Sequence, residues 1–283
     1  MTQAADIKLL IADVDGTLVP HDKVLTPAAT SAAADLRRAG VGLALTSARP
    51  PMGMRMLIEP LVLELPIAGF NGGLILDAKL RELESHAIAA AVVSEAVQLI
   101  KDLGLDLWIY TDTAWFVTNL KGAHVEREAW IIKMDPEAAP PLTDNRLGRV
   151  FKIVGVSDDH PKVAAAEAEA QRRLGDRASA TRSEPHFLDV TDVMATKGWV
   201  VRSLSARLGV AREQIASIGD MPNDVLMFRE TGLSIAMGNA SDDVKARADA
   251  VTDSNEHDGF AKAVRRFVLP RAFAEAGKDW RPS

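Results

Sequence analysis

The sequence predicts an α/β protein in which a parallel sheet with helices on both faces is interrupted by an inserted α+β segment. Three observations support this. Residues 1–76 alternate apolar runs with helical patterns, and the chain from about residue 189 onward repeats that alternation. Residues 84–188 instead combine pairs of neighbouring strands with helices between them. We therefore expect a discontinuous core domain, 1–83 and 189–283, with an inserted domain at 84–188.

The N-terminal elements follow from local patterns. Ile7–Ala12 is a continuous apolar run, as expected of a strand buried on both faces. Thr26 and Pro27 suit the N-cap and first position of a helix, and Gly40 suits its end. The further elements expected in this part are a strand at 41–47, a helix around 52–63, and a strand with a turn at 66–73.

The rest of the chain shows the same alternation of helical and strand patterns. Val200, Leu204 and Leu208 mark one apolar face of a helix. After it we expect a short buried strand at 214–220 and then alternating helices and strands to about residue 254. In the insert we expect helices at 87–103 and 161–174, strands around 105–111, 114–118 and 150–156, and two short strands reaching about residue 190. The Pro-rich stretch "MDPEAAPPLTDN" is expected to be an irregular loop of the insert.

Composition narrows the class of protein. The 283 residues are 47% hydrophobic and 25% charged, as in ordinary globular proteins. The absence of cysteine excludes disulfides, thiolate catalysis and Cys-based zinc or iron–sulfur sites. A net charge of −6 argues against nucleic acid as a partner. With neither a signal-peptide pattern nor an apolar run of membrane length, we expect a cytoplasmic protein without a membrane partner, whose oligomeric state the sequence leaves unknown.

Two aspartates follow the first apolar strand, in "LLIADVDGTLVP" at 9–20. The Asp15-Gly16 pair is also typical of a hairpin turn, but Pro20 and charges stand where a return strand would be needed. An EF-hand loop is disfavoured, because Thr17 occupies a ligand position and Leu18 the glycine position. On this motif alone, a simple turn and a site built on Asp13 and Asp15 both remain open.

A second acidic group follows another strand, in "SIGDMPND" at 217–224. Asn223 or Asp224 could simply cap the next helix. Yet Asp13 and Asp220 both stand at the carboxyl ends of expected parallel strands, where open α/β sheets bind their ligands. Carboxylates that converge there repel each other, which implies a cation. Oxygen ligands without cysteines or paired histidines favour a hard ion, with Mg²⁺ first.

Two further polar residues lie where they could hold a phosphate group. Ser47 ends the strand at 41–47, and Lys197 lies directly before the helix of Val200. Taken singly, such a serine is more often a turn residue and such a lysine more often a solvated one. Their significance comes from their order along the chain with the two acidic motifs.

In that order the motifs resemble those of the haloacid dehalogenase-like (HAD) phosphohydrolases, and specifically their Cof-type branch, also called class IIB. The resemblance covers nearly the whole chain. "DVDGT" at 13–17 is similar to the family's DxDGT, "TSARP" at 46–50 to TGRP, Lys197-Gly198 to its lysine motif, and "GDMPND" at 219–224 to GDxxND. "FNGG" at 70–73 and the stretch 236–260 resemble further signatures of the branch. Ser47-Ala48 replaces the common Thr-Gly but keeps the hydroxyl.

The resemblance implies a Rossmann-like core with an inserted cap of the C2B type. Residues 16–46 are too few to contain a cap, whereas residues 48–196 can finish the core segment and add one. It also implies a Mg²⁺-dependent phosphomonoester hydrolase that forms an aspartyl-phosphate on a small phosphorylated metabolite, with a sugar phosphate expected. The presence of Asp15 favours phosphate chemistry, because the dehalogenases lack this second aspartate.

Roles for individual residues come from the same resemblance. Asp13 would be the nucleophile and Asp15 the general acid and base. The other implied roles are magnesium binding by Asp13, the Asp15 main-chain carbonyl and Asp220, phosphate binding by Ser47, Lys197 and Asn223, and an orienting role for Asp224. A phosphosugar mutase with the same first steps is the alternative, and a non-catalytic phosphosugar-binding protein is a weaker one.

Overall fold

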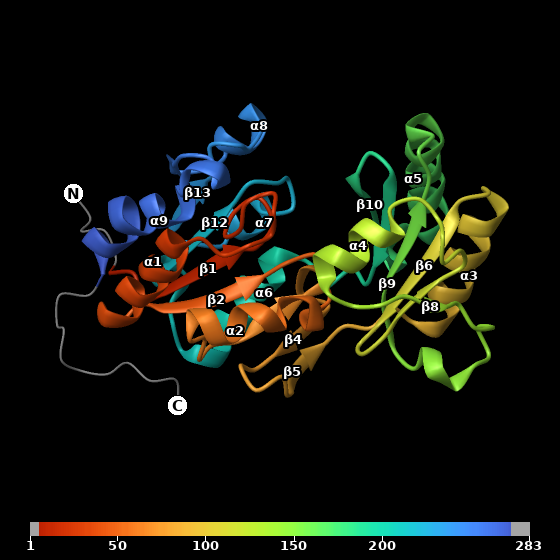
Figure 1. Cartoon of the computed structure of the whole chain (residues 1–283), viewed down its shortest axis with the longest axis horizontal. Coiled ribbons are helices and arrows are strands. Elements are labelled where there is room, and N and C mark those ends of the chain that lie inside the picture. Colours follow the sequence, from red (N-terminus) through yellow and green to blue (C-terminus); the bar gives the residue numbers. More distant parts are fainter. Residues whose placement is uncertain (1–5, 273–283) are drawn as a thin grey trace. The chain divides into compact units, whose positions relative to one another are not determined.

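The computed structural model describes residues 6–272, apart from the side chain of Arg146. The chain forms two compact units. Within the described residues, the first contains residues 6–48, Arg55–Leu83 and residues 196–272, and the second contains Arg49–Met54 and Glu84–Ala195. Residues 1–5 and 273–283, which we assigned to the core domain, lie outside the described residues. Figure 1 shows the first unit in red, orange, teal and blue and most of the second in yellow and green.

An eight-stranded sheet forms the centre of the first unit, in the order β14-β13-β12-β1-β2-β3-β4-β5. Its strands are β1 (Leu9–Asp13), β2 (Gly42–Thr46), β3 (Ile67–Gly69), β4 (Leu74–Leu76), β5 (Glu82–Ser85), β12 (Ile215–Gly219), β13 (Leu233–Ala236) and β14 (Ala250–Val251). Neighbours from β14 to β3 are parallel. The expected parallel α/β core is therefore confirmed. The exception is β4, which returns antiparallel to β3 because the loop at Phe70–Gly72 reverses the chain.

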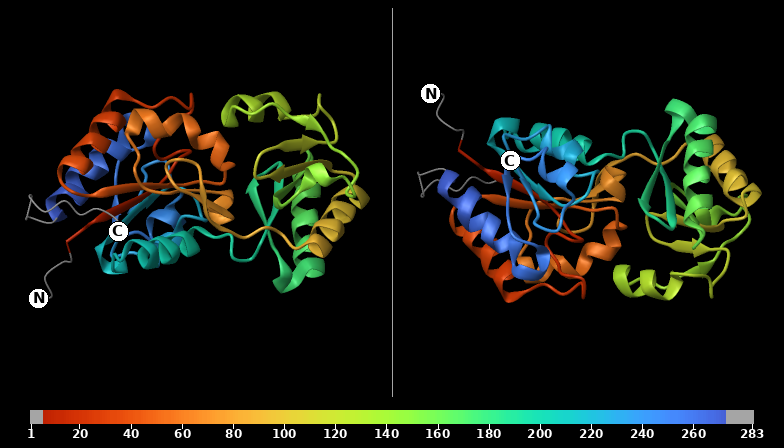
Figure 2. Two further views of the ribbon diagram at one scale, coloured as in Figure 1. Left: turned by 90° about the horizontal axis from the view of Figure 1, so that it is seen from below. Right: turned by 90° about the horizontal axis from the view of Figure 1, so that it is seen from above.

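Helices cover both faces of this sheet (Figure 2). They are α1 (Pro27–Arg38), α2 (Arg55–Leu61), α6 (Lys197–Leu208), α7 (Val225–Phe228), α8 (Asp242–Lys245) and α9 (Gly259–Ala263), with short turns of helix at 70–72, 212–214, 255–257 and 264–271. Ile11 of β1 packs in one apolar cluster with Val200 and Leu204 of α6. On the other face α1 packs on β2 and α9. Thr26 caps α1 as expected, since its hydroxyl accepts the N–H of Ala29 at 3.1 Å.

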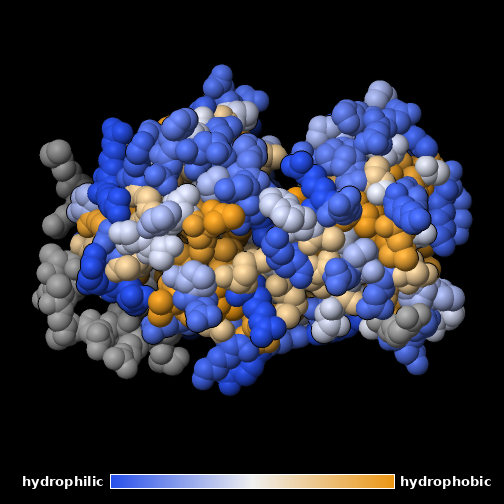
Figure 3. All heavy atoms as spheres, viewed as in Figure 1, coloured by the Kyte–Doolittle hydropathy of each residue, from blue (hydrophilic) through white to orange (hydrophobic). Residues whose placement is uncertain are grey.

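The second unit is built on a six-stranded sheet in the order β10-β11-β9-β6-β7-β8. Its strands are β6 (Asp106–Thr111), β7 (Trp115–Val117), β8 (Glu137–Ala138), β9 (Val150–Val156), β10 (Ser179–Glu184) and β11 (Phe187–Thr191). Its helices are α3 (Ala90–Asp102), α4 (Val125–Ile132) and α5 (His160–Leu174), with short turns of helix at 51–54, 145–147 and 175–177. Ile100 of α3 and Ala166 of α5 share an apolar cluster with Ile153 of β9. The inner side of α5 carries the buried Val163, Ala166, Ala170 and Leu174, as expected of an amphipathic helix on a sheet. The upper part of the second unit, on the face drawn in Figure 3, is mostly hydrophilic.

The compact units differ from the expected domains in two places. Because β11 pairs with β9, with Thr191 opposite Lys152, residues 189–195 lie in the second unit and not in the first. The segment Arg49–Met54 also belongs to the second unit. There Arg49 Nη1 donates to the carbonyl of Ile131 in α4 at 3.0 Å. None of the helices within residues 6–272 offers an apolar stretch of the length that a bilayer requires.

Candidate active site

Three of the motifs meet at one edge of the eight-stranded sheet. Asp13 is the last residue of β1, and Asp220 directly follows β12. Their strands are neighbours in parallel register, with Ala12 opposite Ile218. On the other side of β1, Asp13 lies opposite Thr46, the last residue of β2, and Ser47 comes next. The carboxyl ends of three adjacent strands therefore carry these polar residues, as expected from the sequence.

Lys197 brings two of the acidic motifs into direct contact. It is the first residue of α6, after the N-cap Thr196, and its side chain is only 2% exposed. Its Nζ lies 2.7 Å from Asp13 Oδ1 and 2.5 Å from Asp224 Oδ1. Burial alone would lower the pKa of Lys197, but the carboxylates of Asp13 and Asp224 outweigh it and raise the pKa above its usual value. The lysine is therefore held as an ammonium ion between two carboxylates.

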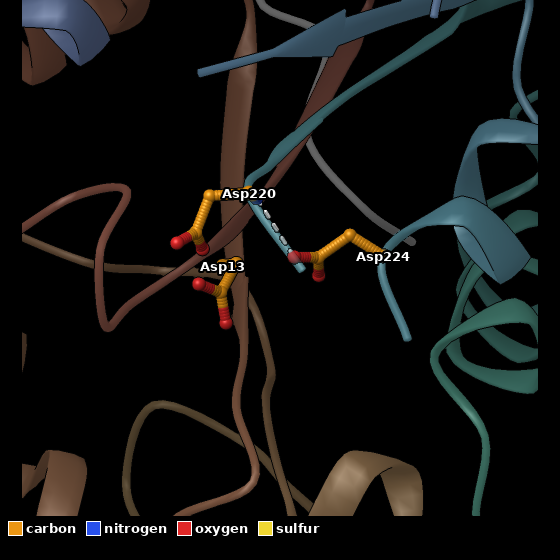
Figure 4. Close-up of side chains that lie close together, drawn as sticks. All are labelled: Asp13, Asp220 and Asp224. Atoms are coloured by element: carbon orange, nitrogen blue, oxygen red, sulfur yellow. Dashed lines mark hydrogen bonds between the residues drawn. The ribbon is translucent and has the colours of Figure 1, made fainter. Parts of the chain in front are cut away.

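Asp224 uses both of its oxygens within the protein. While Oδ1 binds Lys197, Oδ2 accepts the main-chain N–H groups of Asp220 and Met221, each at 2.9 Å. The bond from the N–H of Asp220 is the dashed line in Figure 4. Gly219 is required beside it, because a Cβ there would lie 2.2 Å from Asp224 Cγ. Asp224 thus closes the turn after β12 and holds the lysine. The orienting role expected for it stays a prediction.

Asp220 has a different environment from its two acidic neighbours. Its oxygens accept hydrogen bonds from Thr17 Oγ1 at 3.3 Å and from Asn239 Nδ2 at 3.0 Å, which are neutral donors. Burial, with the nearby charge of Asp224, raises the pKa of Asp220 to about 7. Burial also raises the pKa of Asp13 well above its usual value, and the charges of Asp224 and Asp220 add to this against the opposing effect of Lys197.

The acidic cluster has the donor atoms of a metal site. One carboxylate oxygen from each of Asp13, Asp220 and Asp224 lies within 4.8 Å of the others, and Figure 4 shows Asp13 and Asp220 side by side. Three ionised carboxylates against the single ammonium of Lys197 leave two negative charges uncompensated. Burial is the main cause of the raised pKa values of Asp13 and Asp220, and the charges of the neighbouring carboxylates add to it. A hard divalent cation would balance the two uncompensated charges, and a donor set of carboxylate oxygens is what such ions prefer.

Asp15 lies in a more open environment than Asp13. Its side chain is 32% exposed, compared with 6% for that of Asp13. Asp15 Oδ1 forms an ion pair with Lys23 Nζ at 2.7 Å. Lys23 was missed from the sequence, because it lies in an aperiodic loop and is brought back to Asp15 only by the turns of residues 14–23.

Asn71 connects the remaining two predicted residues. Its main-chain N–H donates to the carbonyl of the buried Ser47 at 2.8 Å, and its Oδ1 accepts Asn223 Nδ2 at 3.1 Å. Asn223 Oδ1 is buried and has no hydrogen-bond partner within residues 6–272. Because amide nitrogen and oxygen are assigned from the hydrogen-bond network, exchanging them in both residues keeps their mutual bond and puts a donor at the unpartnered position. The "FNGG" signature contained Asn71, but nothing in the sequence gave it a partner.

Comparisons with known proteins show relatives over most of the chain. The haloacid dehalogenase-like hydrolase family matches residues 10–264. One curated relative is the 5-amino-6-(5-phospho-D-ribitylamino)uracil phosphatase YcsE of Bacillus subtilis, 27% identical over 266 residues that cover 93% of this chain and 97% of the relative. Another is the pyridoxal phosphate phosphatase YbhA of Escherichia coli, 24% identical over 274 residues that cover 93% of this chain and 99% of the relative.

Solved structures show the same fold over most of this chain. A haloacid dehalogenase-like hydrolase from Bacteroides thetaiotaomicron superposes with a TM-score of 0.83 and 28% identity, covering 92% of this chain and 99% of its own. A HAD subclass IIB sugar phosphatase superposes with a TM-score of 0.78 and 22% identity. The match covers 93% of this chain and 99% of that structure's chain. The chain therefore belongs to the haloacid dehalogenase-like hydrolases, as its motifs predicted, and is an enzyme of their phosphatase type.

Proposed function

We propose that this enzyme is a Mg²⁺-dependent phosphomonoester hydrolase that forms an aspartyl-phosphate on Asp13. The observation that carries the proposal is the buried Lys197 between Asp13 and Asp224, with Asp220 beside them at the edge of the sheet. The first compact unit would be the catalytic core domain, and the second would be its cap domain.

Asp13, Asp220 and the main-chain carbonyl of Asp15 are the groups that would hold the magnesium ion. Asp224 is less suited, because Lys197 and two N–H groups already occupy its oxygens. A bound magnesium ion offsets the repulsion between an anionic nucleophile and an anionic phosphate.

The protein groups account for each proton and bond of the reaction. A carboxylate oxygen of Asp13 attacks phosphorus and forms the new P–O bond, while the bond from phosphorus to the leaving oxygen breaks. Asp15, in its protonated form, gives its proton to that leaving alkoxide. Asp15 then takes a proton from water as the water oxygen attacks phosphorus, which releases phosphate and regenerates Asp13. The greater exposure of Asp15 suits a group that exchanges protons with a leaving group and with water.

Ser47, Lys197 and Asn223 would bind the oxygens of the transferring phosphoryl group. Lys197 is held rigidly by two carboxylates, so its charge is in place before the reaction begins. Asn223 would contribute Nδ2 in the exchanged orientation that its contact with Asn71 permits. Preorganised donors of this kind are worth roughly 3–4 kcal/mol each by mutation.

The substrate would be a small phosphorylated metabolite. Relatives of comparable identity are named for a ribitylaminouracil phosphate and for pyridoxal phosphate, which supports the class but no single member of it. A sugar phosphate stays the prediction from the motifs. Nothing in the described residues favours a mutase or a binding protein over a hydrolase.

Phosphate release from a panel of sugar, nucleotide and cofactor phosphates, with and without Mg²⁺, tests the proposal. Asp13→Asn should lose all turnover while keeping the wild-type circular dichroism spectrum, because an amide oxygen is too weak a nucleophile. Asp243→Asn, at an exposed position of α8, is the matched control and should keep full activity. Substantial turnover by Asp13→Asn would refute the aspartyl-phosphate, and an isomerised sugar phosphate without free phosphate would indicate the mutase.

A further inference from the structure

We propose that Asn239, in the loop between β13 and α8, is a positioning residue that fixes the Asp220 carboxylate for the metal ion. The inference rests on the proposed function, since it concerns the same site. Asn239 lies in the "AMGN" part of the stretch 236–260, to which the sequence assigned no role.

The side chain of Asn239 joins three loops at the carboxyl edge of the sheet. Its Nδ2 donates to the carbonyl of Gly16 at 2.9 Å and to Asp220 Oδ2 at 3.0 Å. Its Oδ1 accepts the main-chain N–H of Asn255 at 3.0 Å. Both hydrogens of the amide group and its oxygen are therefore engaged. The exposed side chain of Asn239 thus connects the loop after β1 to Asp220, which follows β12.

Gly16 makes this double contact possible. It has a left-handed φ of 77°, and a Cβ on it would lie 2.3 Å from Asp220 Oδ2. Without that Cβ, the carboxylate of Asp220 packs directly against the main chain of Gly16. The carbonyl of Gly16 and Oδ2 of Asp220 then lie close enough for one amide nitrogen to reach both.

Asn239 carries no charge, so it can orient the Asp220 carboxylate without neutralising it. Asp13 and Asp224 are ion-paired to Lys197, but within residues 6–272 Asp220 has no ion-pair partner. Asn239 and Thr17 instead hold its oxygens by hydrogen bonds that leave the negative charge in place. A carboxylate that is oriented and keeps its charge is well suited to bind a metal ion, and loss of outer contacts of this kind typically lowers metal affinity by about 10–100-fold.

Asn255 binds Asn239 through its main-chain N–H, and its own side chain offers a control variant. Its Nδ2 donates to the carbonyl of Val19 at 3.3 Å, and its side chain is buried. Asn255→Ala removes this loop contact but leaves the main-chain N–H that binds Asn239. It should therefore lower thermal stability while leaving the orientation of Asp220 intact. Asn239→Ala, at an exposed site, should do the reverse.

Isothermal titration of the metal-free full-length protein with MgCl₂ tests the proposal without recourse to activity. For Asn239→Ala we expect the Kd for Mg²⁺ to rise about 10–100-fold, with a melting temperature close to that of the wild type. Phosphatase assays should show the matching change, with kcat recovered to within a few-fold of wild type when Mg²⁺ is in large excess. For Asn255→Ala we expect a lower melting temperature and a wild-type Kd.

Two results would overturn the inference while leaving the proposed function standing. One is wild-type Mg²⁺ affinity in Asn239→Ala. The other is an equal loss of affinity in Asn255→Ala, which would show that general loosening of the loops is responsible. A wild-type protein that binds no Mg²⁺ and hydrolyses phosphomonoesters without it would instead refute the metal dependence, and this inference with it.

Discussion

Asp224→Asn is the most informative single perturbation of the site. In the wild type, the Asp224 carboxylate accepts three hydrogen bonds, one from Lys197 and two from main-chain N–H groups. An asparagine has only one acceptor oxygen. It can satisfy either the lysine or the two N–H groups, and its NH₂ group must then face a donor on the other side.

The expected cost follows from these contacts. Removing one partner of a buried ion pair destabilises a protein by about 3–5 kcal/mol. Lys197 keeps Asp13 at 2.7 Å, so the lower end of that range applies. Loss of the Asp224 charge also relieves its repulsion of Asp13 and Asp220, which offsets part of the cost. We expect a net loss of about 2 kcal/mol, since a hydrogen bond to a charged group contributes about 1.5–3 kcal/mol.

Urea unfolding in metal-free buffer and single-turnover phosphate release measure the two consequences. A lysine displaced by about 1 Å should lower kcat by about 100-fold. Asp243→Asn, an exposed residue of α8, is the control and should change stability by less than about 0.5 kcal/mol. If Asp224→Asn matched this control in stability and kept the wild-type kcat, the lysine would not depend on Asp224 and the reasoning would be wrong.

Two further predictions concern Asp220. Because its pKa is raised from 3.8 to about 7 on folding, the folded protein binds the extra proton between those values. Its contribution to stability is therefore present below about pH 4 and lost as the pH rises through 7. Urea unfolding should show that slope in metal-free protein. Saturating Mg²⁺ should flatten the slope, and Asp220→Asn should reduce it, because Asp13 also has a raised pKa. Gly16→Ala should weaken Mg²⁺ binding in calorimetry, because its Cβ would displace Asp220 Oδ2, whereas Gly40→Ala, with a similar φ of 72° but nothing within 4 Å, should keep wild-type affinity.

The placement of the acidic residues could be predicted from the sequence because of strand geometry. Apolar runs that end in Asp13 and Asp220 are strands, and parallel neighbours bring their carboxyl ends to one edge. The contact of Lys197 with both Asp13 and Asp224 did not follow from periodicity. The resemblance to the HAD motifs supplied its role, and the structure supplied its partners.

The missed features depend on loops and short elements. Asn239, Lys23 and Asn71 reach the site from segments without periodicity, so no pattern relates them to their partners. The strand β4 was missed because it has only three residues and follows a reversal of the chain. The helix α4 was missed because it begins after His124, in a left-handed conformation, and not after a residue typical of an N-cap.

Because the second unit includes the segment Arg49–Met54, it cannot be transferred to another protein as the insert alone. Arg49 donates to the main chain of α4, and a Cβ on Gly53 would lie 3.1 Å from the side chain of Ile132. A chimera that transplants residues 84–195 alone would therefore separate Arg49 and Gly53 from the residues of α4 that they contact. A grafting experiment should carry residues 49–54 and the insert together.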